Sequence, residues 1–96
     1  MRVRWTVPAL RDLETIGEFI EHGNSAAIAA RIATAILDQA ENLAVFPHIG
    51  RPGRIAGTRE LVIVGTPFIA PYRVRDDAVE VLAVFHGSRQ WPDALN

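Results

Sequence analysis

The stretch that separates two kinds of sequence, and so decides the fold, is Gly50-Arg51-Pro52-Gly53-Arg54-Ile55-Ala56-Gly57-Thr58-Arg59. Its three glycines and one proline make it too irregular for a helix or a strand. Before it, the spacing of apolar residues is typical of helices, and after it the pattern is typical of strands. The stretch also holds three arginines and no acidic residue. It is therefore both a joint between two halves of the chain and a candidate functional surface.

Two amphipathic helices are expected before the joint, the first between Thr6 and His22 and the second between Ser25 and Pro47. Thr6, followed by Pro8, and Ser25 are the expected N-caps. The short turn between the helices predicts an antiparallel helical hairpin, and residues 2–6, which alternate polar and apolar, predict a short strand before it. Apolar residues recur every three or four positions in both helices: Leu10, Leu13, Ile16, Phe19 and Ile20 in the first, and Ile28, Ile32, Ile36, Leu43 and Phe46 in the second.

Three strands are expected after the joint, over residues 58–64, 68–75 and 79–86. If Asp76-Asp77 form the tip of a hairpin, one face of the last two strands carries only apolar and aromatic pairs. These pairs are Val74 with Val79, Tyr72 with Val81, Ala70 with Ala83, and Phe68 with Phe85. The predicted class is therefore α+β, a single domain over residues 1–96 with the order βααβββ and a mainly antiparallel sheet, whose strand order the sequence leaves open.

The other face of that hairpin is more apolar than a solvated face requires. It carries Arg73 opposite Glu80, with Ile69, Leu82, Val84 and His86 further along. We expect this face to be covered by the tail of the chain, by a second copy or by a partner. Pro71 lacks the N–H that a central strand needs, which predicts a local bulge or an orientation that does not need that donor.

Composition excludes several classes of function. The chain has 96 residues, a formal net charge of −1 and no cysteine. These totals argue against a general polyanion binder and exclude disulfides and thiolate metal sites, which suits a reducing cytoplasm. We see no leader and no apolar run long enough to span a membrane. The three histidines lack metal-ligand spacing, and we expect neither a metal nor a cofactor.

One set of residues could bind or cleave a phosphodiester. Arg59, Arg73, His86 and Arg89 lie on or beside the predicted strands, where the arginines could hold a phosphate and His86 could act as acid or base. The same arginines could instead pair with Glu60, Glu80 and Asp93, which is the reading that composition favours. Trp91 is expected to cover the edge of the sheet rather than to stack on a base.

The chain resembles the RelE/ParE family of toxins from bacterial type II toxin–antitoxin modules over nearly its whole length. The residues that carry the resemblance are Asp12-Leu13 with Ile16 and Phe19-Ile20, Gly50-Arg51-Pro52-Gly53-Arg54, Gly57-Thr58-Arg59-Glu60-Leu61, Pro67-Phe68, Tyr72-Arg73-Val74, and Val79 to Arg89. The order βααβββ is also that of the family. The resemblance therefore implies a toxin, with a small antitoxin as its partner.

The RelE branch of this family cleaves mRNA on the ribosome with lysines, arginines and commonly a tyrosine. At those positions this chain has Glu60, Val62, Ile69 and Leu95, and only Arg89 matches. A carboxylate at Glu60 would repel the phosphate that a lysine would hold. The resemblance is thus to the ParE branch, which implies growth inhibition through DNA gyrase with no catalytic residue. RNA cleavage by Arg59, Arg73, His86 and Arg89, or an inactive homologue that serves as a binding module, are the alternatives.

The resemblance also suggests where partners bind. The candidate residues for target binding are Arg51, Arg54, Arg59, Arg89 and Trp91. The antitoxin, a ParD-like or similar protein, is expected to dock on the helical hairpin and the sheet, with its acidic residues meeting toxin arginines. The candidates for that contact are Ala29, Ala33, Ile69, Arg73, Leu82 and Val84. We expect no sequence-specific DNA binding by this chain, since that usually belongs to the antitoxin.

Overall fold

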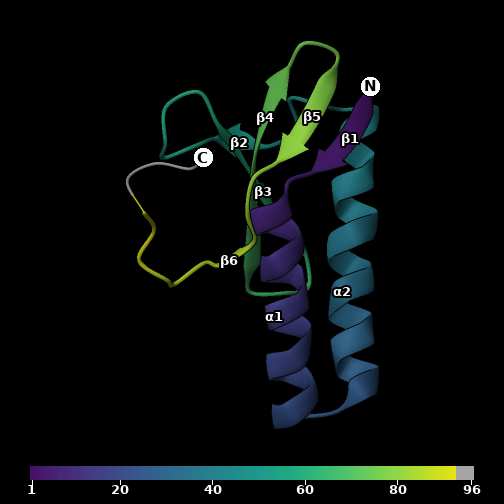
Figure 1. Ribbon diagram of the computed structural model, residues 1–96. Coiled ribbons are helices and arrows are strands. Elements are labelled where there is room, and N and C mark those ends of the chain that lie inside the picture. Colours follow the sequence, from purple (N-terminus) through teal and green to yellow (C-terminus); the bar gives the residue numbers. More distant parts are fainter. Residues whose placement is uncertain (93–96) are drawn as a thin grey trace.

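The computed structural model describes residues 1–92, in which two long helices pack on one face of a mixed sheet (Figure 1). The helices are α1 (Val7–Gly23) and α2 (Ala26–Glu41), followed by the 3-10 turn η1 (Asn42–Ala44). The strands are β1 (Arg2–Trp5), β2 (Arg51–Pro52), β3 (Arg59–Val62), β4 (Phe68–Arg75), β5 (Ala78–Val81) and β6 (Phe85–His86). The α+β class and the order βααβββ are confirmed, with β2 and the break between β5 and β6 as additions.

Both helices begin at the predicted caps. The Thr6 Oγ1 accepts a hydrogen bond from the amide of Ala9 at 3.4 Å, and the Ser25 Oγ accepts one from the amide of Ile28 at 3.1 Å. The second helix is shorter than predicted. α2 ends at Glu41, and the 3-10 turn η1 follows it. Pro47 disfavours a helical conformation in the residue before it, which is Phe46. The prediction that Phe46 belongs to the buried stripe of this helix was therefore wrong.

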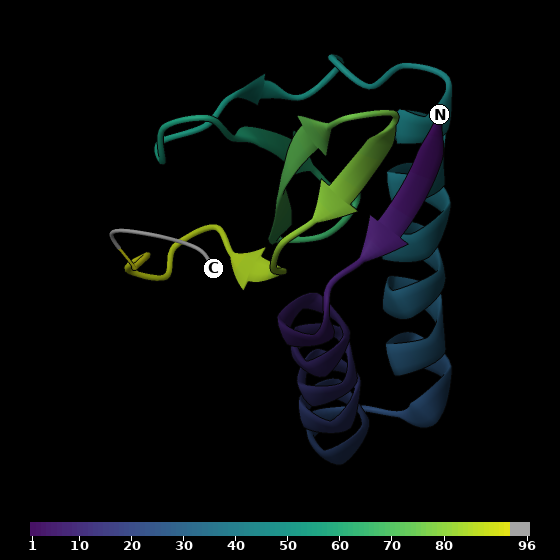
Figure 2. The ribbon, with the colours of Figure 1, turned by 45° about the horizontal axis from the view of Figure 1, so that its top comes forward.

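The helical hairpin extends past one end of the sheet, so its far end has no strand to cover (Figures 1 and 2). This explains why Phe19 and Ile28 of the predicted stripes are exposed, at 79% and 39%. Leu10, in the first turn of α1, is also 49% exposed, so its predicted place in the buried stripe was wrong. The part of the hairpin next to the sheet is buried, and Ala9, Ile32 and Ile36 join one core cluster with residues of β4 and β5. Burial of a side chain such as Ile36 contributes roughly 1.5–3 kcal/mol.

The sheet has the strand order β1-β5-β4-β3-β2, with β6 also paired to β4. β1 runs parallel to β5, and the other pairs are antiparallel. Figure 2 shows β1, in purple, at one side of the sheet and β2 toward the other. The predicted hairpin tip at Asp76-Asp77 is confirmed, with Tyr72 paired to Val81 and Arg75 paired to Ala78.

The pairing changes register by one residue beyond Pro71. Ile69 lies opposite Phe85, and Phe68 lies opposite His86, so the predicted pairs Ala70–Ala83 and Phe68–Phe85 were wrong. The Pro71 carbonyl accepts the Leu82 amide at 2.9 Å. Because the N and O of a strand residue point to the same side, the N–H that proline lacks would face the segment where β5 leaves the ladder. The bulge expected from Pro71 is therefore present, between β5 and β6.

The register change also moves Val84 to the other side of the sheet. Val84 lies in the core cluster beneath the helices, whereas Phe85 has turned to the opposite face. The prediction that Val84 belongs to the outer face was wrong for this reason. The amide of Val84 has no strand partner and donates instead to the Asp12 Oδ2 of α1 at 2.9 Å.

Candidate functional site

The Gly/Arg joint is held in shape by close packing. At Gly50 a Cβ atom would lie 2.6 Å from the Tyr72 hydroxyl oxygen and 2.9 Å from the Glu60 carbonyl oxygen, so only glycine fits there. The amide of Gly53 donates to the Thr58 carbonyl at 2.8 Å, which closes the loop between β2 and β3. The joint was predicted to be too irregular for a strand, but Arg51 and Pro52 form β2 against β3, and that prediction was wrong at these two residues.

Two of the arginines in the joint bind a glutamate of the chain itself. Glu60 is only 2% exposed, and its carboxylate accepts from Arg51 Nε at 3.0 Å and Arg54 Nε at 3.1 Å. It also accepts from the Arg54 amide at 2.8 Å. Burial alone would raise the pKa of Glu60, but the hydrogen bonds from Arg54 and Arg51 outweigh it and hold this pKa below its ordinary value. The carboxylate is therefore ionised and forms ion pairs with both guanidinium groups.

A second buried carboxylate lies further along the same face of the sheet. The Glu80 oxygens accept from Arg73 Nε and Arg4 Nη2, each at 2.8 Å. The hydrogen bond from Arg73 is the main cause that lowers the pKa of Glu80, and the positive charges of Arg4 and Arg75 add to it. The expected pairing of Arg73 with Glu80 is confirmed. Arg4 was missed, because no pattern in the sequence indicates that β1 lies parallel to β5.

Arg59 differs from these arginines. Its Nη1 donates to the carbonyl oxygens of Gly50 at 2.9 Å and of His48 at 3.2 Å, and both partners are uncharged. Within residues 1–92 no carboxylate forms an ion pair with it. Arg59 also lines a hollow of about 340 Å³ together with His48, Thr58 and Arg73. Arg59 is thus the arginine of the joint that forms no ion pair with an acidic side chain of the described residues.

The four residues of the RNA-cleaving alternative do not form one site. Arg59 and Arg73 line the same hollow, whereas His86 and Arg89 are not among the residues that line it. The His86 Nδ1 lies 2.8 Å from the Ser88 Oγ, and the Arg89 guanidinium lies over the Phe85 ring at 4.7 Å. Two residues named in the sequence analysis lie outside the described residues. They are Asp93, a possible ion-pair partner of the arginines, and Leu95, which stands near the position of the tail tyrosine.

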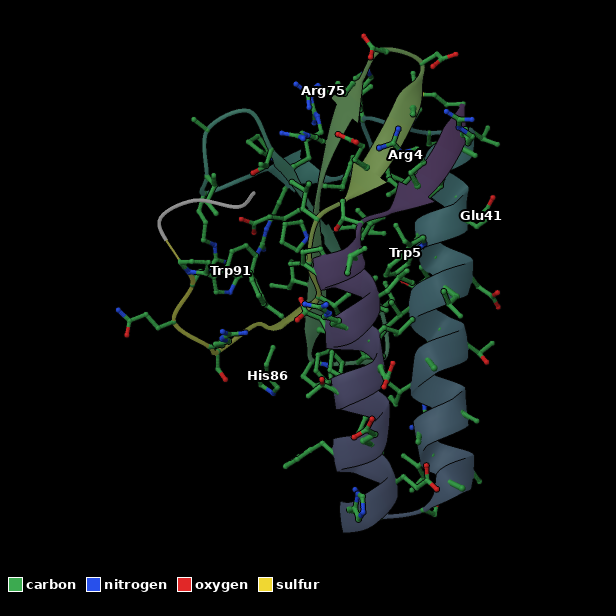
Figure 3. The ribbon with its side chains drawn as sticks, in the orientation of Figure 1. Arg4, Trp5, Glu41, Arg75, His86 and Trp91 are labelled. Carbon is green, nitrogen blue, oxygen red and sulfur yellow. The ribbon has the colours of Figure 1, made fainter. Side chains whose placement is uncertain are left out.

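Trp91 folds back onto the face of the sheet away from the helices. Its side chain is labelled in Figure 3. The centroid of its ring lies 5.0 Å from that of Phe85 in an edge contact, and the Arg54 guanidinium lies over the ring at 3.6 Å. The indole Nε1 is buried and has no hydrogen-bond partner among residues 1–92. The tail after β6 lies on the side of the sheet away from α2 in both ribbon views. Of the candidate target-binding residues, Arg51, Arg54 and Trp91 are therefore all engaged within the chain.

Most of the candidate antitoxin-binding residues are buried within the chain. Ala29, Ile69, Leu82 and Val84 are all less than a tenth exposed. Ala33 is half-buried, and Arg73 is bound to Glu80. Contact of the antitoxin with these six residues stays a prediction. Sequence reasoning missed the apolar residues that are exposed after α2, because Phe46 had been assigned to the helix.

In residues 1–92 there is no group of three or more histidine, aspartate and glutamate side chains that could hold a metal ion. Neither α1 nor α2 is long and apolar enough to cross a membrane.

Comparison with known proteins places this geometry among toxins. A model of the ParE toxin of type II toxin–antitoxin systems, parDE, matches residues 3–91. The Y4kP protein of Sinorhizobium fredii is 48% identical over 98% of this chain and 96% of its own length. Toxin RelE2 of Caulobacter vibrioides is 37% identical over 92% of this chain and 97% of its own length.

Two solved structures have the same fold. The chromosomal ParDE toxin–antitoxin system from P. aeruginosa contains a chain with a TM-score of 0.83 and 27% identity, matched over 90% of this chain and 95% of that one. The toxin–antitoxin complex RelBE2 from Mycobacterium tuberculosis contains one with a TM-score of 0.66 and 27% identity, matched over 88% and 95%.

Proposed function

The chain belongs to the family of ParE toxins from type II toxin–antitoxin systems, and we propose that it arrests growth by binding DNA gyrase in the cytoplasm without doing chemistry itself. The observation that carries the proposal is the match of the ParE model to residues 3–91. A cognate antitoxin would neutralise it.

The state of the arginines supports binding rather than RNA cleavage. Catalysis of phosphodiester cleavage needs cationic donors aimed at the position where negative charge develops. Here Arg51 and Arg54 are bound to Glu60, and Arg73 is bound to Glu80. The ionised Glu60 carboxylate also cancels one of the two positive charges of Arg51 and Arg54, which leaves less positive charge to hold a phosphate at this face.

RNA cleavage is kept as a second candidate because two comparisons favour it. Toxin RelE2 is 37% identical to this chain, and the RelBE2 complex shares its fold. The hollow lined by His48, Arg59 and Arg73 is the place on the described chain where a cleavage reaction would find two arginines and an imidazole together.

The antitoxin is supported as a partner by the solved neighbours, since ParDE and RelBE2 are both toxin–antitoxin systems. The far end of the helical hairpin offers Phe19 and Ile28, whose apolar side chains are exposed. An amphipathic helix could lay its apolar face on these residues and on Ala33. We therefore place the first contact of the antitoxin on the hairpin.

The proposal is tested by expressing the chain from an inducible promoter, with and without its antitoxin. Growth arrest, induction of a DNA-damage reporter and loss of supercoiling by purified gyrase are the results expected from the toxin alone. Mapping of mRNA 5′ ends in the same cells tests the second candidate. Cleavage at fixed codon positions without a DNA-damage response would replace gyrase binding with RNA cleavage, and normal growth would contradict both.

A further inference from the structure

We propose that the turn formed by residues 45–49, together with Arg59, is the surface that docks the protein target, and that it receives an apolar segment carrying a carboxylate. This inference rests on the proposed function, because it assumes that the chain has a protein target. The residues 45–49 are called the docking turn below.

The docking turn exposes an unusual amount of apolar surface for so short a segment. Val45, Phe46 and Ile49 are 72%, 59% and 62% exposed, and the turn lines a hollow of about 380 Å³. A second hollow of about 360 Å³ adjoins it through Ile49 and is lined by Val62 and Val64, which are also exposed. Contiguous exposed apolar surface of this kind on a small protein marks an interaction site.

The turn is rigid although its side chains point outward. The Tyr72 hydroxyl, which is fully buried, donates to the Pro47 carbonyl at 2.8 Å and accepts the Gly50 amide at 2.9 Å. Burial raises the pKa of this hydroxyl, so it keeps its proton and its role as a donor at neutral pH. The amides of Val45 and Phe46 both donate to the Asn42 carbonyl. A partner that binds here therefore has little backbone to order.

The far side of the second hollow is held in a similar way. The side-chain amide of Gln39 both donates to and accepts from the backbone of Val64, at 2.9 and 2.8 Å. This pair of bonds ties the turn after β3 to α2 and fixes the position of the exposed Val64. Both walls of the apolar surface are thus preorganised, as in the central contacts of protein interfaces.

Charge decides what kind of segment fits. His48 lines both the apolar hollow and the hollow that contains Arg59, so the two areas adjoin. Within residues 1–92 Arg59 is bound only to carbonyl oxygens, so none of these residues supplies an anion for its charge. An apolar side chain on the docking turn with a carboxylate reaching Arg59 satisfies both areas. A nucleic-acid backbone would satisfy only the cationic one, and the net charge of the chain is −1.

Position on the fold favours the target over the antitoxin. The exposed apolar residues Phe19 and Ile28 lie toward the far end of the hairpin, where α1 ends and α2 begins, while the docking turn follows the other end of α2 (Figure 1). α2 has 16 residues, so about 24 Å separate the two ends. A chain with two separate apolar surfaces can present one to each partner.

The test uses two matched exposed phenylalanines. Phe46→Ser and Ile49→Ser, alone and combined, are compared with Phe19→Ser in three measurements: growth arrest at equal expression, affinity for purified gyrase, and affinity for the purified antitoxin. We expect the turn variants to lose about tenfold or more in gyrase affinity and to lose growth arrest. Their antitoxin affinity should stay within about twofold. Phe19→Ser should show the reverse pattern.

Two substitutions test whether the positive charge of Arg59 contributes to target binding. Arg59→Gln should weaken gyrase binding, while Arg59→Lys should restore part of it because the positive charge remains. The unfolding temperature of each variant is first compared with that of the wild type. If the combined Phe46→Ser and Ile49→Ser variant is less stable, only the single variants are used. The antitoxin complex provides a second check of folding.

Three outcomes would overturn the inference. If the wild type arrests growth and the turn variants arrest it equally, the surface is wrong while the proposed function stands. If Arg59→Gln abolishes mRNA cleavage and Phe46→Ser has no effect, the hollow serves RNA instead. Normal growth of cells that express the wild type would contradict the proposed function itself, and this inference with it.

Discussion

Glu60 is the residue on which the Gly/Arg joint depends. Its carboxylate is almost wholly removed from water and binds two guanidinium groups that remain half exposed, Arg51 at 51% and Arg54 at 43%. A buried carboxylate without partners would be strongly unfavourable, whereas here four N–H groups compensate for the lost water. The arginines that look available in the sequence thus act first as structural partners of one glutamate.

Replacement of this carboxylate should cost stability in a pH-dependent way. We expect Glu60→Gln to lower the free energy of unfolding at pH 7 by about 1–2 kcal/mol, less than for a fully buried pair because both arginines reach water. The pKa of Glu60 is depressed in the folded state. The advantage of the wild type over the variant should therefore be complete above about pH 4.3, the ordinary value, and fade as the pH falls through the lower folded value.

Urea unfolding of both proteins at several pH values from 7 down to 3 measures this difference. Glu41→Gln is the matched control, because Glu41 is an exposed carboxylate at the end of α2. It should change stability by less than about 0.5 kcal/mol at every pH. A constant difference between Glu60→Gln and the wild type over the whole range would show that the carboxylate makes no charge-dependent contribution.

The two glycines Gly50 and Gly17 should respond in opposite ways to alanine. In Gly50→Ala the new methyl group would meet the Tyr72 hydroxyl at 2.6 Å, and we expect a loss of about 1–3 kcal/mol in the free energy of unfolding. Gly17 lies inside α1 with open space around it, so Gly17→Ala should gain up to about 1 kcal/mol from helix propensity. Thermal unfolding of the two variants measures both signs, and equal shifts would contradict the packing argument.

At the scale of elements, the break between β5 and β6 depends on a contact with α1. The Val84 amide is buried in the bulge and donates to the Asp12 Oδ2. We expect Asp12→Ala to lower the free energy of unfolding by about 1–3 kcal/mol, because the amide is left without a partner. Asp12→Asn keeps a side-chain oxygen and should lose less. Hydrogen exchange at Val84 should become much faster in the alanine variant only.

Glu14→Ala on the exposed side of the same helix is the control for the loss of a carboxylate. It should leave the exchange rate at Val84 unchanged. Equal acceleration in both variants would mean that the effect comes from α1 as a whole and not from the bond to Val84.

The elements show which features were predictable from sequence. Periodicity and caps are local, and they located both helices, the strand runs and the tip at Asp76-Asp77. The register beyond Pro71 was not predictable, because it depends on where a neighbouring strand leaves the ladder. The same limit applies to the site: alternation predicted the Arg73–Glu80 pair, but the contribution of Arg4 requires the parallel pairing of β1 with β5, which no local pattern encodes.

At the scale of the whole molecule, charge is divided between the hairpin and the rest. Residues 7–44 hold two arginines and six acidic residues (2 − 6 = −4), and the remaining residues hold eight arginines and five acidic residues (8 − 5 = +3). A partner that contacts both parts must therefore carry both signs of charge. Such a division favours one orientation of approach over others and acts mainly on the rate of association.

The exposed apolar residues imply that binding of a partner adds much to the stability of the folded chain. An antitoxin that binds only the folded chain should stabilise it by about 2.7 kcal/mol at a hundredfold excess over its Kd. For a domain of 96 residues this corresponds to a rise in Tm of roughly 10–20 °C. Phe19→Ser, which removes an exposed ring from the hairpin, should reduce that rise at the same antitoxin concentration. Phe46→Ser should leave the antitoxin-dependent rise in Tm unchanged. Thermal scans of the three proteins with increasing antitoxin measure the effect, and a rise that Phe46→Ser reduces as strongly as Phe19→Ser would mean that the antitoxin also covers the docking turn.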